Sequence, residues 1–170
     1  MTEMMLHDQV FKTKPYDAQL EALLASRDKE YFAYLMEMGT GKSKVLIDNT
    51  SYLFAHGKIN GLVIVTMKSL CRSWSDDLIP THLPDSIDRH VVVWRSSTKS
   101  FESELKKLFV IEPLKLHVLI MNIDAVKTDR GYEALEKFLL SHNVLSAIDE
   151  SIIIKNHKAE QTKIMLKFRR

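Results

Sequence analysis

The chain has 170 residues, of which 45% are hydrophobic and 27% are charged, so it is long and apolar enough for one globular domain with a sizeable core. The formal net charge of +2 excludes a strongly basic field over the whole surface, so any nucleic-acid contact must be local. The single cysteine, Cys71, excludes an internal disulfide, and no Cys/His cluster has the spacing of metal ligands.

The N-terminal stretch MTEMMLHDQ carries acidic residues and lacks the apolar centre of a signal peptide. No apolar run is long enough to cross a bilayer. We therefore expect an intracellular protein, cytoplasmic or associated with nucleic acid, that is not secreted and has no membrane partner. No stretch has the composition of a linker or a low-complexity segment, and no repeat is found. We therefore expect a single domain over residues 1–170.

Helical patterns alternate with short apolar runs along the chain. Apolar side chains recur at helical spacing in five segments, 15–26, 42–56, 68–78, 100–109 and 131–142. Largely continuous apolar runs, typical of strands covered on both faces, occur at 31–36, 61–66, 90–95, 116–121 and 144–148. This alternation predicts an α/β fold with a doubly wound, mainly parallel sheet of about five or more strands and helices on both faces. Such sheets bind ligands at the carboxyl ends of their strands.

The stretch LMEMGTGKS has the ending of a phosphate-binding loop. Gly41, Lys42 and Ser43 match the end of the pattern G-x-x-x-x-G-K-[ST], while Met36 stands where the first glycine is usual. Gly39 and Gly41 let backbone N–H groups turn toward phosphate oxygens at the start of the next predicted helix. Lys42 would then reach the β- and γ-phosphates, and the Ser43 hydroxyl would bind Mg²⁺. The alternative is an ordinary turn followed by a solvated lysine, which the combination of strand, glycines, Lys-Ser and helix disfavours.

An acidic pair follows the last predicted strand. Asp149 comes directly after VLSAI and would hold Mg²⁺, and Glu150 would act as the general base that polarises the attacking water. Taken alone, the pair is weak evidence, and the N-cap of a following segment is the ordinary interpretation. Together with the phosphate loop, it predicts a site for ATP and Mg²⁺.

Several motifs occur in an order that is similar to a known family: KPYDAQLEAL, MEMGTGKS, LVIVTMKSLCRSWSDDL, HVLIMNIDAV and IDESIIIKNHKAEQTK. From about Lys14 to Lys163 the chain resembles the first RecA-like lobe of superfamily 2 helicase-like ATPases, and most closely the Swi/Snf-type branch of DNA translocases. A phosphate loop without the first glycine is normal in that branch. Lys155 and Asn156 match the KN that follows its acidic box.

The resemblance implies that Gln19 reads the adenine edge, since an amide can donate and accept a hydrogen bond at once. Without the resemblance, an exposed helix glutamine would be the favoured interpretation. The expected catalytic residues are Lys42 and Glu150, and the expected metal ligands are Ser43 and Asp149. The nucleotide-binding set is then Gln19, Met38, Gly39, Thr40, Gly41, Lys42 and Ser43.

The resemblance also implies that nucleic acid, with duplex DNA favoured, is a partner of the chain. Lys68 and Ser69 are expected to meet a DNA phosphate, which suits tracking along a strand without reading its sequence. Arg72 and Asn122 are further candidates, although a solvated arginine and a turn residue are equally open interpretations. Trp74 is expected to pack in the core rather than stack on a base.

Neither an S/T-G-T/S-P-type segment after Lys163 nor a second RecA-like lobe appears in the sequence. Arginine fingers on such a lobe contribute on the order of 10³–10⁵ in rate in related enzymes. We therefore expect an ATP-binding lobe of a DNA-dependent ATPase that needs a second lobe, in the same or another chain, and hydrolyses ATP very slowly or not at all by itself. A non-catalytic binding or regulatory module is the alternative. A small-molecule kinase is disfavoured, because DESIIIKN and TMKSL have no role in its chemistry.

Overall fold

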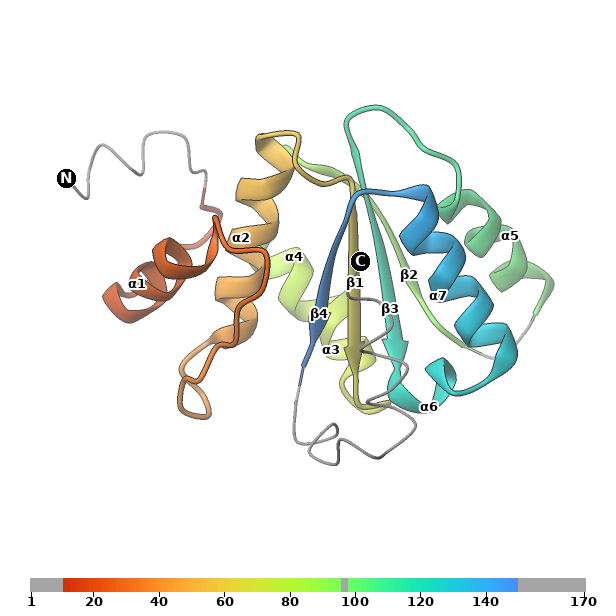
Figure 1. Cartoon of the computed structure of the whole chain (residues 1–170), viewed down its shortest axis with the longest axis horizontal. Coiled ribbons are helices and arrows are strands. Elements are labelled where there is room, and N and C mark those ends of the chain that lie inside the picture. Colours follow the sequence, from red (N-terminus) through yellow and green to blue (C-terminus); the bar gives the residue numbers. More distant parts are fainter. Residues whose placement is uncertain (1–10, 96–97, 150–170) are drawn as a thin grey trace.

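The computed structural model describes residues 11–95 and 98–149, and these contain one sheet of four parallel strands in the order β2-β3-β1-β4. All four arrows point toward the same end of the sheet (Figure 1). The α/β class and the parallel sheet predicted from the sequence are confirmed. The strands are β1 (Gly61–Thr66), β2 (Asp88–Val93), β3 (Lys115–Asn122) and β4 (Val144–Ile148).

Each predicted helical segment is helical in the structure. The segment 68–78 differs from a single regular helix, because it is built of short pieces that include one turn of π-helix, η1. The helices are α1 (Asp17–Ser26), α2 (Lys42–Ala55), α3 (Cys71–Ser73), η1 (Trp74–Leu78), α4 (Ile79–His82), α5 (Lys99–Leu108), α6 (Ile123–Val126) and α7 (Asp129–Ser141).

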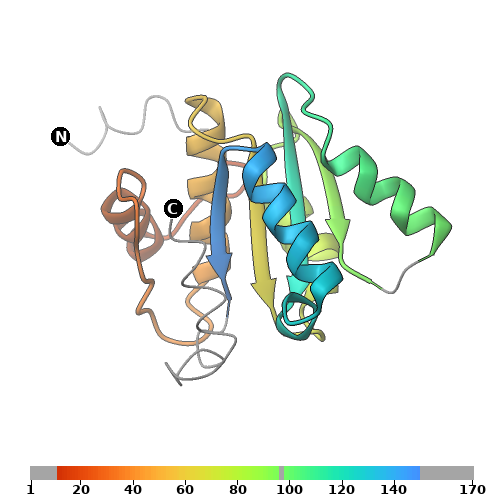
Figure 2. The same cartoon turned by 45° about the vertical axis from the view of Figure 1, so that its right-hand side comes forward.

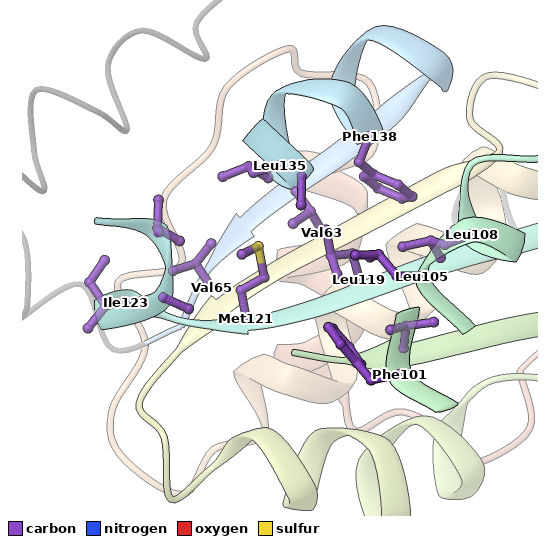
Figure 3. Packing of buried hydrophobic residues seen from close by; sticks show 14 residues of the cluster. Val63, Val65, Phe101, Leu105, Leu108, Leu119, Met121, Ile123, Leu135 and Phe138 are labelled. Atoms are coloured by element: carbon purple, nitrogen blue, oxygen red, sulfur yellow. The ribbon is translucent and has the colours of Figure 1, made fainter. Parts of the chain in front are cut away.

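Helices cover both faces of the sheet, as predicted (Figure 2). On one face, Val63 and Val65 of β1 join a buried cluster with side chains of α5, α6 and α7, including Phe101 and Phe138 (Figure 3). On the other face, the alternate β1 residues Leu62 and Ile64 join a second cluster with side chains from α2 to α4. Every residue of β1 is buried, because this strand is covered on both faces and paired on both edges. That explains its unbroken apolar sequence.

The strand predicted at residues 31–36 is wrong. These residues form no strand, and their largest apolar side chains are exposed, Leu35 by 95% and Tyr31 by 57%. The Tyr34 hydroxyl instead bonds Ser26 Oγ of α1 at 2.8 Å, and the Met36 carbonyl accepts from the Lys42 ammonium. These polar contacts hold the segment to α1 and α2, away from the sheet. In the described part of the chain β4 is therefore an edge strand, and the sheet has four strands rather than the predicted five or more.

A buried ion pair fastens the first turns of α2. Lys44 Nζ donates to Asp48 Oδ2 at 2.5 Å, and the two side chains are only 7% and 2% exposed. Burial raises the pKa of the Asp48 carboxyl, and the hydrogen bond from Lys44 opposes that rise. Lys44 Nζ also lies 5.5 Å from the centre of the Phe11 ring, so the chain that precedes α1 packs against α2.

Three histidines gather at the amino ends of the strands. His117 of β3 is fully buried between His142, which follows α7, and His90 of β2, with ring centroids 4.8 Å and 6.3 Å away. Within the described residues, His117 Nδ1 and His142 Nε2 have no hydrogen-bond partner. Burial, followed by the proximity of His142 and His90, lowers the pKa of His117 to about 4. Glu112 partly offsets that fall and Lys115 adds to it.

Replacing Asp48 by alanine should destabilise the protein by about 3–5 kcal/mol, because it leaves the buried Lys44 charge without its partner. The change is measured as the free energy of unfolding in urea. The double variant Lys44→Met with Asp48→Leu should recover most of that loss, since it removes both charges and keeps apolar volume. Glu104→Ala, which removes an exposed carboxylate from the exposed Arg95, is the matched control and should cost much less. A loss for Asp48→Ala no larger than for this control would contradict the prediction.

Acid should destabilise the fold between about pH 6.5 and pH 4. The unfolded chain protonates His117 below about pH 6.5, whereas the folded chain keeps it neutral down to about pH 4. The contribution of His117 to the free energy of unfolding is therefore fully present above pH 6.5. About 2–3 kcal/mol of it is lost as the pH drops through this range. Urea unfolding at a series of pH values measures the slope. His117→Phe should flatten it, whereas His56→Gln, at an exposed position, should not; equal slopes in the wild type and His117→Phe would contradict the assignment.

Candidate functional site

The phosphate-loop segment adopts the backbone that its glycines permit. Gly39 and Gly41 have φ angles of +80° and +85°, in the left-handed region that other residues seldom adopt. Gly41 is the N-cap of α2, which begins at Lys42 as predicted. The loop therefore delivers the chain to the positive end of a 14-residue helix, a geometry that favours anion binding.

Lys42 folds back over this loop. Its ammonium donates to the Met36 carbonyl at 3.0 Å and to the Glu37 carbonyl at 2.9 Å. An ammonium has three N–H donors, so a third remains for an anion in the loop. Lys42 is thus tied to two carbonyls of the loop, and its contact with nucleotide phosphates stays a prediction.

Gln19 is attached to the same loop. Its side chain accepts a hydrogen bond from Tyr16 N at 3.1 Å and donates from Nε2 to the Thr40 carbonyl at 3.0 Å. A Cβ at position 41 would lie 2.4 Å from Gln19 Nε2, so a side chain there would displace the Gln19 amide from its contact with Thr40. Gln19 is 5% exposed, and the interpretation of an exposed helix glutamine is wrong. Reading of adenine by this amide stays a prediction.

Asp149 is held by contacts from two other elements. Its backbone N–H donates to the Val65 carbonyl at 2.9 Å, which continues the pairing of β4 with β1. Its Oδ2 accepts from Trp74 Nε1 at 2.8 Å and from Thr66 Oγ1 at 3.4 Å. Trp74 is buried in the core, as predicted. Sequence reasoning missed Thr66 and the indole contact, although a buried tryptophan N–H generally needs a polar partner and Thr66 ends a central strand.

Two groups of side chains result. The start of α2 and the ends of β1 and β4, to which these groups belong, lie toward the same end of the sheet (Figure 1). One contains Gln19, Thr40, Gly41 and Lys42 around the loop, and the other contains Thr66, Trp74 and Asp149. Among residues 11–95 and 98–149, no hydrogen bond joins Ser43 to Asp149. Met38 is exposed at the tip of the loop. The predicted base Glu150, together with Lys155 and Asn156, lies outside the described residues.

The expected magnesium ligands form an oxygen donor set. Ser43 offers a hydroxyl and Asp149 a carboxylate oxygen, which suits Mg²⁺, a cation that keeps several waters and binds substrate phosphates. In the described part of the chain, no group of three or more His, Cys, Asp or Glu side chains could hold a metal ion. Binding of a Mg²⁺ ion by Ser43 and Asp149 together with a nucleotide stays a prediction, in which the ion would polarise the phosphate oxygens.

The segments expected to meet nucleic acid lie together. Exposed Lys68 and Ser69, after β1, share a depression of about 610 Å³ with Met67, Ile123 and Asp124. Parallel pairing of β1 with β3 brings these loops side by side. The depression is therefore lined by one cation, Lys68, and one carboxylate, Asp124, and the Asp124 carboxylate is paired with Lys127 Nζ at 2.7 Å.

Arg72 and Asn122 have different surroundings at this edge. Arg72 is exposed on α3. Asn122 is half-buried at the N-cap of α6, where its Oδ1 accepts from Ala125 N at 2.9 Å. The structure therefore gives Asn122 the local role of a turn residue, one of the two interpretations open from the sequence. A contact from either side chain to nucleic acid stays a prediction.

Two comparisons of the sequence with known proteins found no relative. A scan against protein-family models gives no match, and a search of curated proteins finds none either. No helix among the described residues is both long and apolar enough to span a membrane.

Proposed function

We propose that this chain is an ATP-binding, RecA-like lobe of a nucleic-acid-dependent ATPase of the superfamily 2 helicase type. The observation that supports it most is the loop before α2, where two left-handed glycines, the N-terminal end of a helix and the Lys42 ammonium meet. This combination is suited to a phosphate chain. Its position at the carboxyl end of an all-parallel sheet is where such folds bind ligands.

In this proposal each side chain has one task. The N–H groups of the loop and Lys42 would stabilise the charge of the β- and γ-phosphates, and Ser43 and Asp149 would hold a Mg²⁺ ion that supplies further charge neutralisation. Gln19, fixed against Thr40, recognises the base. Glu150 orients the attacking water as general base.

We propose a nucleic-acid partner because of where the loops after β1 and β3 lie. Lys68 and Ser69 are exposed next to the loop of Ile123 and Asp124, at the same end of the sheet as the phosphate loop. A single lysine and a hydroxyl suit contacts to backbone phosphate, which do not depend on sequence. Duplex DNA is proposed from the Swi/Snf-type resemblance.

Hydrolysis is proposed to require a second RecA-like lobe, in the same or another chain. Closure of two lobes would exclude water and bring an arginine to the transferring phosphate. The alternative proposal is a stand-alone binding or regulatory module that uses the same loop without turnover. The two proposals share nucleotide binding and differ in whether a supplied second lobe restores hydrolysis.

Lys42→Ala should weaken binding of Mg-ATP by at least about tenfold, because a charge-assisted contact to the phosphates is lost. Isothermal titration calorimetry of ATP in excess Mg²⁺ measures it. Lys58→Ala removes an exposed lysine beyond the opposite end of α2 and is the matched control, with affinity expected to equal the wild type. Unchanged affinity in Lys42→Ala would remove the phosphate-loop assignment.

Phosphate release from Mg-ATP by this chain alone should stay at or near background, with or without duplex DNA, since no arginine finger is supplied. A coupled phosphate assay measures it, with Glu150→Gln as the control for genuine turnover. DNA-stimulated release that disappears in Glu150→Gln would show a working ATPase, and the requirement for a second lobe would then be wrong.

A further inference from the structure

Trp74 joins the hydrophobic core to the acidic residue at the end of β4. Its ring is 1% exposed, in the buried cluster that includes Ile47, Leu62 and Ile64. The indole Nε1–H reaches out of that cluster to Asp149 Oδ2 at 2.8 Å. A hydrogen bond to an ionised carboxylate is stronger than one between neutral groups, and here its donor cannot swing away because the ring is enclosed.

The contact selects one of the two oxygens of Asp149. Trp74 Nε1 and Thr66 Oγ1, at 3.4 Å, both donate to Oδ2. The backbone N–H of Asp149 is fixed separately by the Val65 carbonyl. The carboxylate is therefore held at its backbone and at Oδ2, and its rotation about the side-chain bonds is restricted. Oδ1 is the carboxylate oxygen that remains available to bind a ligand.

We propose that Trp74 is a positioning residue, whose indole holds Oδ2 of Asp149 so that Oδ1 is presented to the Mg²⁺ of a bound nucleotide or to a water on that ion. This inference rests on the proposed function, because it assigns Trp74 to the same nucleotide site. Groups that orient a metal ligand from behind typically change metal affinity or activity by about 10–100-fold when they are removed. Trp74 is suited to that role because its anchor is the rigid core rather than a loop.

A purely structural role for the same contact makes a different prediction. In that case Asp149 only satisfies a buried indole N–H, and loss of the indole would weaken folding without a specific effect of Mg²⁺. The two roles separate when nucleotide affinity is compared in the presence and absence of the metal. Stability alone would not separate them, because both roles lose the same hydrogen bond.

The test is the affinity for ATP, by isothermal titration calorimetry, in excess Mg²⁺ and in excess EDTA. The wild type should bind more tightly with Mg²⁺. Trp74→Phe should keep the affinity measured in EDTA, which depends on Lys42 and the loop, and lose about tenfold of the enhancement by Mg²⁺. Trp94→Phe is the matched control, because it makes the same chemical change at the other tryptophan, which packs on Phe101 with ring centroids 5.4 Å apart. It should behave as the wild type.

A second readout keeps the native Trp74. In Trp94→Phe, Trp74 is the only tryptophan, so its fluorescence reports on the indole beside Asp149. Its emission should change with Mg-ATP and much less with ATP in EDTA. Thr66→Val, which removes the longer contact to the same oxygen, should lower the Mg²⁺ enhancement less than Trp74→Phe does. The fluorescence measurement remains decisive if Trp74→Phe fails to fold.

Full Mg²⁺ enhancement in Trp74→Phe would overturn the proposal, as would an equal loss of affinity in Mg²⁺ and in EDTA. Should Trp74→Phe fail to fold, a Trp74 emission that responds alike to ATP with and without Mg²⁺ would overturn it. Failure of the proposed function has its own signature, since the wild type itself would then bind no ATP under either condition.

Discussion

Parallel pairing of β1 with both β3 and β4 is the constraint on which the rest of the structure depends. Parallel neighbours cannot be joined by a tight turn, so each connection must cross a face of the sheet, and helices end up covering both faces. The same pairing brings the carboxyl ends of the strands to one edge. Thr66, Asn122 and Asp149 therefore come together from distant parts of the sequence, and the loop before α2 reaches the same end (Figure 1).

The candidate site is held in two different ways. At the loop, glycine backbone conformations and the amide of Gln19 fix the shape, and the Lys42 ammonium is bonded to the Met36 and Glu37 carbonyls. At β4, the core fixes Asp149 through the indole of Trp74. Backbone geometry thus shapes the proposed anion site, and packing of the core orients the Asp149 carboxylate. Preorganisation of this kind lowers the entropic cost of binding a charged ligand.

Much of the fold could be predicted because local pattern and tertiary role agree. Unbroken apolar runs such as GLVIVT require cover on both faces, and the pattern of α7 requires one buried stripe. The run YFAYLM has the same apolar character but is not a strand, because pairing depends on a distant edge that local pattern does not encode. Tyr34 and the Met36 carbonyl have polar partners on α1 and α2 instead. The contact of Trp74 with Asp149 joins residues 75 positions apart and was likewise beyond the sequence, as was the packing of His90, His117 and His142.

The central claim is that nucleotide phosphates bind in the loop before α2. Amide hydrogen exchange of the wild-type chain, with and without Mg-ATP, tests it most directly, because the N–H groups of residues 39–43 would become hydrogen-bonded to phosphate oxygens. With Mg-ATP, amide hydrogen exchange should be slower at these residues and at Asp149, and it should change little in α5 and α7. Unchanged exchange at residues 39–43 under saturating Mg-ATP would contradict it.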